Sequence, residues 1–268
     1  MARSEIGHRK RFVGCIMPPL TTHLVVAERV FPHLEQFDSA EYGAFLTGNL
    51  VVDVNGFTAV SRRTTHFVGR LEEDGDAAFT KSCVKFLDQR ERLLLRPWAN
   101  LTPEERAFVA GYLCHLAADE PWKAMGARLQ QSLGLESLQD MPVPPAVILT
   151  AFSVLSHALF VDFAAVAAAL NTALLPDVFT HVAYADFLRM WDIVRLPLLK
   201  GDSPESFFEM LARSGRDAAE VQKVREQHAR HWDAAVALIE QVGGVEVFVA
   251  EAVERALEVL PALNESEL

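Results

Sequence analysis

The stretch TPEERAFVAGYLCHLAADEPW, residues 102–122, carries the clearest helix signal in the chain. Thr102 is a typical N-cap residue, Pro103 suits the first helical turn, and the acids that follow lie at the positive end of the helix dipole. The pattern predicts a helix that begins at Pro103 and ends near Asp119. His115 and Asp119 are four residues apart, so both side chains lie on one face of that helix.

The segment around the pair is largely apolar, with Leu113, Leu116, Ala117 and Ala118, so we expect it to be buried. A buried ionisable side chain is costly unless it is paired or binds a metal. His115 and Asp119 therefore form either a hydrogen-bonded pair or part of a metal site. The spacing of these two residues alone does not choose between the two.

Helical signals recur along the chain. Ser203 and Asp217 begin further predicted helices in the way that Thr102 does, and Gly243–Gly244 ends the helix that Asp217 opens. No hairpin dipeptide lies between alternating strands. We therefore predict an all-α fold, a multi-helix bundle around a buried metal site.

The helical pattern also predicts the domain organisation. Residues 1–16 are expected to form a flexible N-terminal arm, and residues 17–268 a single all-α domain. Within that domain, residues 200–268 are either an integral part or an appended helical subdomain.

Composition and charge limit the class of protein. The chain has 268 residues and is 50% hydrophobic, which is enough for a sizeable core. Its net charge of −11 argues against general nucleic-acid binding, which needs a basic surface. Three cysteines without a C-x-x-C motif favour a reducing compartment, and the N-terminus lacks the apolar run of a signal peptide. We expect a cytoplasmic protein.

Residues 146–175 are the most hydrophobic stretch and are long enough to span a bilayer. Polar side chains interrupt the stretch, among them His157 and Asp162. The pattern favours a central helix of a helical bundle over a transmembrane segment.

Further candidate metal ligands lie in the first half of the chain. His23 lies in PLTTHLVVAE, Asp53 in LTGNLVVDVNG and His66 in SRRTTHF. Each histidine is flanked by apolar or small residues, so we expect each one to point inward. Together with His115 and Asp119 they would form a site of nitrogen and oxygen ligands. This mixture suits zinc, and also iron, manganese or nickel.

Other polar residues have two interpretations each. Arg62 and Arg63, just before His66, either hold a substrate phosphate or belong to the surface. His157 is either an additional ligand or a hydrogen-bonded core histidine. Glu120 is either a surface acid or an outer partner of a ligand histidine.

The segments MPPLTTHLVVAERV, YGAFLTGNLVVDVNG, RRTTHF and GYLCHLAADEPW, in this order, resemble the zinc-dependent phospholipase C family over about residues 17–122. The resemblance implies an all-α fold with a metal cluster inside it. It also makes Asp53 a candidate general base beside a metal-activated water. The implied ligands are Asp53, His66, His115 and Asp119 for one metal, and His23 and Asp119 for a second.

Two departures from the family pattern affect the expected number of metals. In secreted members a free amino terminus helps to hold the second metal, whereas here 22 residues precede His23. The third site of the family needs a histidine with an acid four residues later, and Val161 stands four residues after His157. We therefore expect one tightly bound zinc, a second and weaker one, and no third.

These features favour a metal-dependent phosphoric ester hydrolase in which a metal-activated water attacks phosphorus. Its substrate would be a small-molecule phosphate ester or a lipid headgroup. The alternative is a non-catalytic, metal-stabilised helical binding protein. The two differ in whether one coordination position is open to water, which the sequence does not determine, and the oligomeric state is undetermined as well.

Overall fold

The computed structural model describes residues 18–67, 81–135, 140–200 and 203–264. Within these ranges the chain forms α-helices, short 3₁₀-helices and no strand, so the predicted all-α class is confirmed. Leu94 and Phe179 make one isolated antiparallel bridge. The predicted N-terminal arm, residues 1–16, lies outside the described residues.

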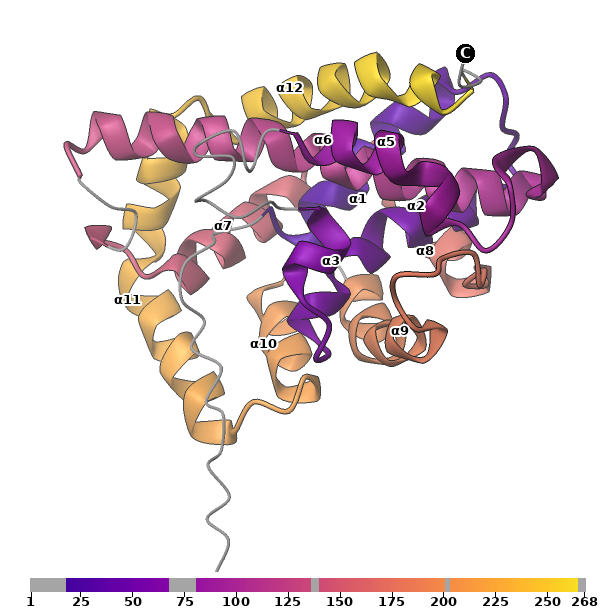
Figure 1. The fold of residues 1–268 in the computed structure, drawn as a ribbon. Coiled ribbons are helices and arrows are strands. Elements are labelled where there is room, and N and C mark those ends of the chain that lie inside the picture. Colours follow the sequence, from indigo (N-terminus) through magenta and orange to yellow (C-terminus); the bar gives the residue numbers. More distant parts are fainter. Residues whose placement is uncertain (1–17, 68–80, 136–139, 201–202, 265–268) are drawn as a thin grey trace, which may run out of the picture.

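The described helices follow one another along the chain as shown in Figure 1. The α-helices are α1 (Leu20–Val30), α2 (Tyr42–Val51), α3 (Arg62–His66), α5 (Ser82–Leu93), α6 (Pro103–Ser132), α7 (Pro145–His157), α8 (Phe163–Thr172), α9 (Tyr184–Leu199), α10 (Pro204–Arg213), α11 (Ala218–Gln241) and α12 (Gly244–Val259). The 3₁₀-helices are η1 (Phe31–His33), η2 (Val52–Gly56), η4 (Trp98–Asn100) and η6 (Leu260–Leu263).

The long helix α6 is the centre of the arrangement. In Figure 1 it runs beside α12 along the top of the molecule, and α1 and α2 also pack against it. The helix α11 packs on α7. Buried residues of α1, α2, α6, α7, α11 and α12 belong to one hydrophobic core, so the segment after residue 200 shares the core of the N-terminal half.

The helices α2 and α6 cross at an unusually short distance. A Cβ atom added to Gly48 would lie 1.9 Å from the carbonyl oxygen of Phe108, and one added to Gly111 would lie 2.0 Å from that of Phe45. Both distances are far below van der Waals contact, so the crossing requires glycine on each helix. The close approach places the carboxyl end of α2, including Asn49, against α6.

The predicted helix starts are confirmed in detail. The Thr102 hydroxyl accepts a hydrogen bond from the Glu105 backbone N–H, and the Glu105 carboxylate accepts one from the Thr102 N–H. This reciprocal pair is a capping box. The Ser203 and Asp217 side chains likewise accept backbone N–H groups at the starts of α10 and α11.

The predicted end of this first helix near Asp119 is wrong, because α6 continues to Ser132. Pro121 lies inside it and removes one helical hydrogen bond. Tertiary packing outweighs that loss. The buried Trp122 ring packs edge-on against Phe152 of α7 at 4.7 Å between centroids, and against an aromatic ring of α12 at 5.3 Å.

The prediction of one central helix over residues 146–175 is also wrong, because the stretch forms α7 and α8 with a break between them. The Asp162 side chain caps α8 by accepting the Ala165 N–H. The Glu28 carboxylate, from α1, accepts the backbone N–H groups of Val161 and Asp162 at 2.9 and 2.6 Å. These bonds satisfy the backbone where the helix stops.

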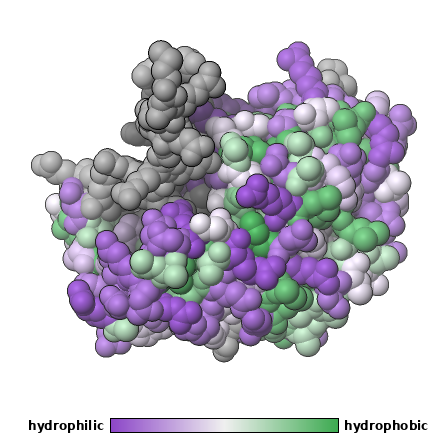
Figure 2. Space-filling model, turned by 90° about the horizontal axis from the view of Figure 1, so that it is seen from below, coloured by the Kyte–Doolittle hydropathy of each residue, from purple (hydrophilic) through white to green (hydrophobic). Residues whose placement is uncertain are grey.

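The surface carries separate apolar patches. Figure 2 shows a face on which hydrophobic patches are interspersed with hydrophilic residues. The large hydrophobic side chains that are exposed among the described residues are spread over several elements: Val84, Leu95, Val161, Leu174, Leu188, Leu196 and Val247. In the part of the chain that is described, no helix combines the length and the apolar character that a membrane crossing needs.

Candidate metal centre

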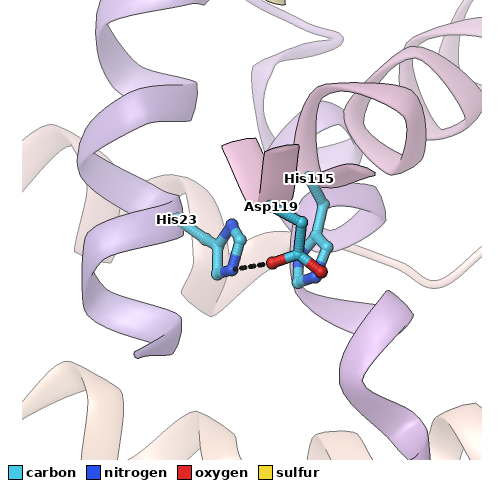
Figure 3. Close-up of side chains that lie close together, drawn as sticks. All are labelled: His23, His115 and Asp119. Carbon is cyan, nitrogen blue, oxygen red and sulfur yellow. Dashed lines mark ion pairs between the residues drawn. The ribbon is translucent and has the colours of Figure 1, made fainter. Parts of the chain in front are cut away.

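The structure brings the five predicted ligands together from four elements. His23 comes from α1, Asp53 from η2 and His66 from the end of α3. His115 and Asp119 lie one turn apart on α6, and in Figure 3 both face His23 across the gap between α1 and α6. We call these five residues the His–Asp cluster.

Asp119 lies between two of the histidines. One carboxylate oxygen, Oδ1, is 3.6 Å from Nε2 of His23, and the other, Oδ2, is 3.5 Å from Nε2 of His66. The two oxygens therefore face different imidazoles. This is the arrangement that a carboxylate bridging two cation positions requires.

Asp53 faces the cluster from the other side. Its Oδ1 lies 3.3 Å from Nε2 of His66 and 3.8 Å from Nε2 of His115. Potential ligand atoms thus gather in two overlapping groups that share His115: His23, His115 and Asp119 in one, and Asp53, His66 and His115 in the other. Within each group the ligand atoms lie within 4.8 Å of one another.

Hydrogen bonds fix the tautomer of His115. Its Nδ1 lies 2.7 Å from the backbone carbonyl oxygen of Asn49. A carbonyl oxygen only accepts, so Nδ1 carries the proton and Nε2 presents a lone pair to the cluster. The partner that orients this ring is therefore the main chain of α2.

The same argument applies to His66. Its Nδ1 lies 2.7 Å from the Thr65 hydroxyl, which in turn lies 3.4 Å from two acceptors, the Asn55 side-chain oxygen and the Arg62 carbonyl oxygen. When the hydroxyl donates to either acceptor, Nδ1 must donate to the hydroxyl. Nε2 of His66 then also presents a lone pair to the carboxylates.

Several polar atoms of the cluster have no hydrogen-bond partner among the described residues. They are both ring nitrogens of His23, Nε2 of His66, Nε2 of His115 and Oδ1 of Asp119. Each of these side chains is at most 2% exposed. Leaving so many buried polar atoms unpaired is costly. The imidazole lone pairs face carboxylate oxygens, so a cation between them would interact favourably with both. Nitrogen and oxygen donors of this kind suit a transition metal.

The three histidines of the His–Asp cluster are neutral at physiological pH. Burial, reinforced by the neighbouring His115, lowers the pKa of His23 to about 3, and burial lowers the pKa of His115 to about 3 as well. The two rings stack with centroids 3.7 Å apart. Burial and the Arg62 guanidinium also hold the pKa of His66 well below its usual value. Metal ligation needs neutral imidazole.

The two carboxyl groups differ in ionisation. Burial raises the pKa of Asp53. Burial also opposes ionisation of Asp119, but the Arg62 guanidinium and the neighbouring imidazoles outweigh it, so its pKa is lowered. Asp119 therefore stays ionised to a lower pH than Asp53.

We expect the metal-free protein to lose stability as the pH falls from about 6.5 toward 3. Unfolded histidines take up protons near pH 6.5, whereas His23 and His115 stay neutral in the fold down to about pH 3. The unfolded state thus binds more protons in this window, and acid favours it. The pKa of His66 is lowered too, so all three imidazoles of the cluster lower the stability of the fold as the pH falls. The raised pKa of Asp53 has the opposite effect on stability.

The test is urea unfolding of metal-stripped protein at pH 7.5 and pH 5. The midpoint should be clearly lower at pH 5, and His23→Gln should reduce the difference. His231→Gln, on α11 and outside the cluster, should leave it unchanged. A midpoint independent of pH would contradict buried neutral imidazoles.

The structure separates the two adjacent arginines. Arg62, the first residue of α3, donates from Nη2 to Asp119 Oδ2 at 3.0 Å and is 20% exposed. Arg63 is exposed, and among the described residues no ion pair joins it to the His–Asp cluster. Arg62 alone is therefore a direct partner of a candidate ligand.

Two other predicted residues lie elsewhere. His157, at the end of α7, packs its ring against Phe163 and Phe160 at 4.3 and 5.3 Å and belongs to neither ligand group. Glu120 is neither a surface acid nor a partner of a ligand histidine. It is buried and accepts a hydrogen bond from Arg255 of α12 at 2.7 Å, because the continuing helix packs α12 against it.

Some supporting residues were not predicted from the sequence. Asn49 and Thr65 orient two of the histidines, and the Tyr112 hydroxyl donates to the Thr65 carbonyl oxygen where α3 ends. Two signals were available: Thr65 directly precedes His66, and Tyr112 lies three residues before His115 on a helix. Nothing in the local sequence indicates that the Asn49 backbone carbonyl would meet His115.

Comparisons with protein-family models, with curated proteins and with solved structures find no match to this chain.

Proposed function

We propose that this protein is a metal-dependent phosphoric ester hydrolase of the kind represented by the zinc-dependent phospholipase C family. The observation that carries the proposal is the convergence of three imidazoles and two carboxylates in a helical core. Nε2 of each imidazole and one Asp119 oxygen there have no hydrogen-bond partner among the described residues. Ligand sets of nitrogen and oxygen with no thiolate are typical of hydrolytic metal sites.

The ligands in this proposal are His23, Asp53, His66, His115 and Asp119. Zinc suits them best, and iron, manganese or nickel accept the same donors. A bound metal of this kind supplies Lewis acidity toward a phosphoryl oxygen and lowers the pKa of coordinated water. The chain itself supplies the neutral imidazoles and their orientation, through the Asn49 carbonyl and the Thr65 hydroxyl.

Asp53 is the candidate general base. Its side chain is 13% exposed, whereas that of Asp119 is 2% exposed, so Asp53 is the carboxylate that solvent reaches. Burial raises the pKa of Asp53, which makes its carboxylate a stronger proton acceptor near neutral pH. It would take the proton from the water that attacks phosphorus.

The substrate class follows from charge. Arg62, partly exposed beside Asp119, favours a substrate with a phosphate group, either a small phosphate ester or a lipid headgroup. The net charge of −11 disfavours a nucleic-acid polymer as the general partner. Burial of four of the five cluster residues, all except Asp53, also fits the alternative, a non-catalytic metal-stabilised protein, which differs in having no turnover.

We expect purified protein to contain about one equivalent of a transition metal, and chelation to lower its Tm by about 5 °C. Metal bound at a preformed buried site stabilises the folded state alone, and a few kcal/mol correspond to shifts of this size in a chain of this length. Elemental analysis and calorimetry before and after chelation measure both. Less than about half an equivalent after reconstitution would contradict the centre.

Catalytic turnover distinguishes the proposed hydrolase from the non-catalytic, metal-stabilised alternative. Metal-loaded protein should hydrolyse at least one member of a panel of phosphodiesters and phosphomonoesters, and His66→Ala should abolish both the metal and the activity. Full metal occupancy without hydrolysis of any panel member would favour the non-catalytic alternative.

A further inference from the structure

One ion pair joins Arg62 to the His–Asp cluster. Arg62 Nη2 lies 3.0 Å from Asp119 Oδ2, the same oxygen that lies 3.5 Å from Nε2 of His66. The other oxygen, Oδ1, has no hydrogen-bond partner in the described part of the chain. The permanently charged Arg62 guanidinium thus already binds one of the two Asp119 oxygens, and both oxygens would be needed to bridge two metals.

The charges of the cluster limit how many cations it can take. Metal binding needs ionised carboxylates and neutral imidazoles. In that form Asp53, Asp119 and Arg62 together carry one net negative charge. One divalent metal would turn this into one net positive charge, and a second would bring three. Uncompensated charge of that size is very costly at a buried site.

Exposure shows where an anion would approach. The side chains of His23, His66, His115 and Asp119 are at most 2% exposed, whereas those of Asp53 and Arg62 are 13% and 20% exposed. Asp53 and Arg62 therefore form the solvent-facing edge. Arg62 brings positive charge to this edge, and its guanidinium has donors beyond the Nη2 group that binds Asp119.

We propose that Arg62 replaces a second metal in this centre: it limits the cluster to one tightly bound metal and binds a phosphate oxygen opposite that metal. The ligand is an anion with at least two phosphoryl oxygens free, one for the metal and one for the guanidinium. The phosphate part rests on the proposed function. The metal count rests on the ion pair and the charges alone.

The first experiment counts metals. Metal-stripped protein is titrated with Zn²⁺ by calorimetry, and bound zinc is measured by elemental analysis after buffer exchange. Wild type should retain one equivalent. Arg62→Gln, which removes the charge, should retain a second equivalent bound at least about tenfold more tightly than in wild type. Arg62→Lys keeps the charge and should retain one equivalent of zinc. Arg63→Gln changes the exposed neighbour on the same helix and should also retain one equivalent.

The second experiment uses inorganic phosphate as the probe on zinc-loaded protein at matched zinc content. Wild type and Arg63→Gln should bind phosphate equally, and Arg62→Gln at least about tenfold more weakly. Two tight equivalents in wild type, or one in both wild type and Arg62→Gln, would overturn the inference. If Arg62→Gln does not fold, wild type and Arg62→Lys still test it, because two equivalents in either one contradict it.

The outcomes also separate this inference from the proposed function. If the zinc counts are as expected but no phosphate ester is hydrolysed, the role of Arg62 at the metal is supported and the hydrolase is rejected. Hydrolysis with two tight zinc ions would retain the hydrolase and reject the role of Arg62.

Discussion

Replacing Gly111 by alanine is expected to lower the Tm by about 10 °C or more. The new Cβ would lie 2.0 Å from the Phe45 carbonyl oxygen and 2.9 Å from the Asn49 backbone nitrogen. These neighbours are backbone atoms of α2 and cannot rotate away, so the helices must separate. Overpacking of this severity costs about 3 kcal/mol or more, and each kcal/mol shifts the Tm by roughly 2–4 °C for a chain of this size.

The same substitution should weaken metal binding, because the α2–α6 crossing holds the Asn49 carbonyl 2.7 Å from Nδ1 of His115. Loss of such an outer contact typically costs about 10–100-fold in metal affinity. Gly56→Ala is the matched control: it lies at the end of η2, close in sequence to Asp53, and a Cβ there would meet nothing within 4 Å. Calorimetry that finds the two variants equally stable would rule out the close crossing.

Asp119→Asn is expected to reduce metal affinity by more than about 100-fold. Its carboxylate faces His23 through one oxygen and His66 through the other. Asparagine has nearly the same shape, but its charge is zero and one oxygen becomes a donor amide. The change removes a candidate ligand from the cluster and leaves Arg62 without its anionic partner. Losing a direct ligand exceeds the roughly 10–100-fold effect of an outer partner.

Glu120→Gln is the control for this variant, since it changes the next acid on the same helix. The two side chains differ by about 100° around the axis of α6, and Glu120 pairs with Arg255 instead of the cluster. It should keep its metal, although it will be less stable. Zinc titration of both metal-stripped variants provides the comparison. Equal zinc affinity would show that the metal, if bound, lies elsewhere.

Local signals in the sequence predicted the helical class and the helix starts correctly. The caps at Thr102, Ser203 and Asp217 depend on hydrogen bonds within a few residues, so neighbouring letters are enough to recognise them. The spacing of His115 and Asp119 also places both on one helical face. The roles of the ligands in binding metal stay a prediction.

Helix ends depended on long-range packing. Local rules stop α6 near Pro121, yet the Trp122 side chain, buried between two other helices, holds the next turns in place. Conversely, the apolar stretch after His157 breaks where the distant Glu28 accepts two backbone N–H groups. In both places, contacts between residues far apart in sequence outweigh local propensity.

The sequence by itself determined which side chains are available to the centre, because ligand chemistry belongs to residue type: three imidazoles, two carboxylates and two adjacent arginines. The tertiary structure alone decided that Arg62 binds Asp119 while Arg63 faces solvent, and that the Asn49 carbonyl orients His115. The physical reason is that burial and ion pairing act over a few ångströms in space. Which groups come that close is set by the crossing of α2 and α6 and by the packing of α3 against η2.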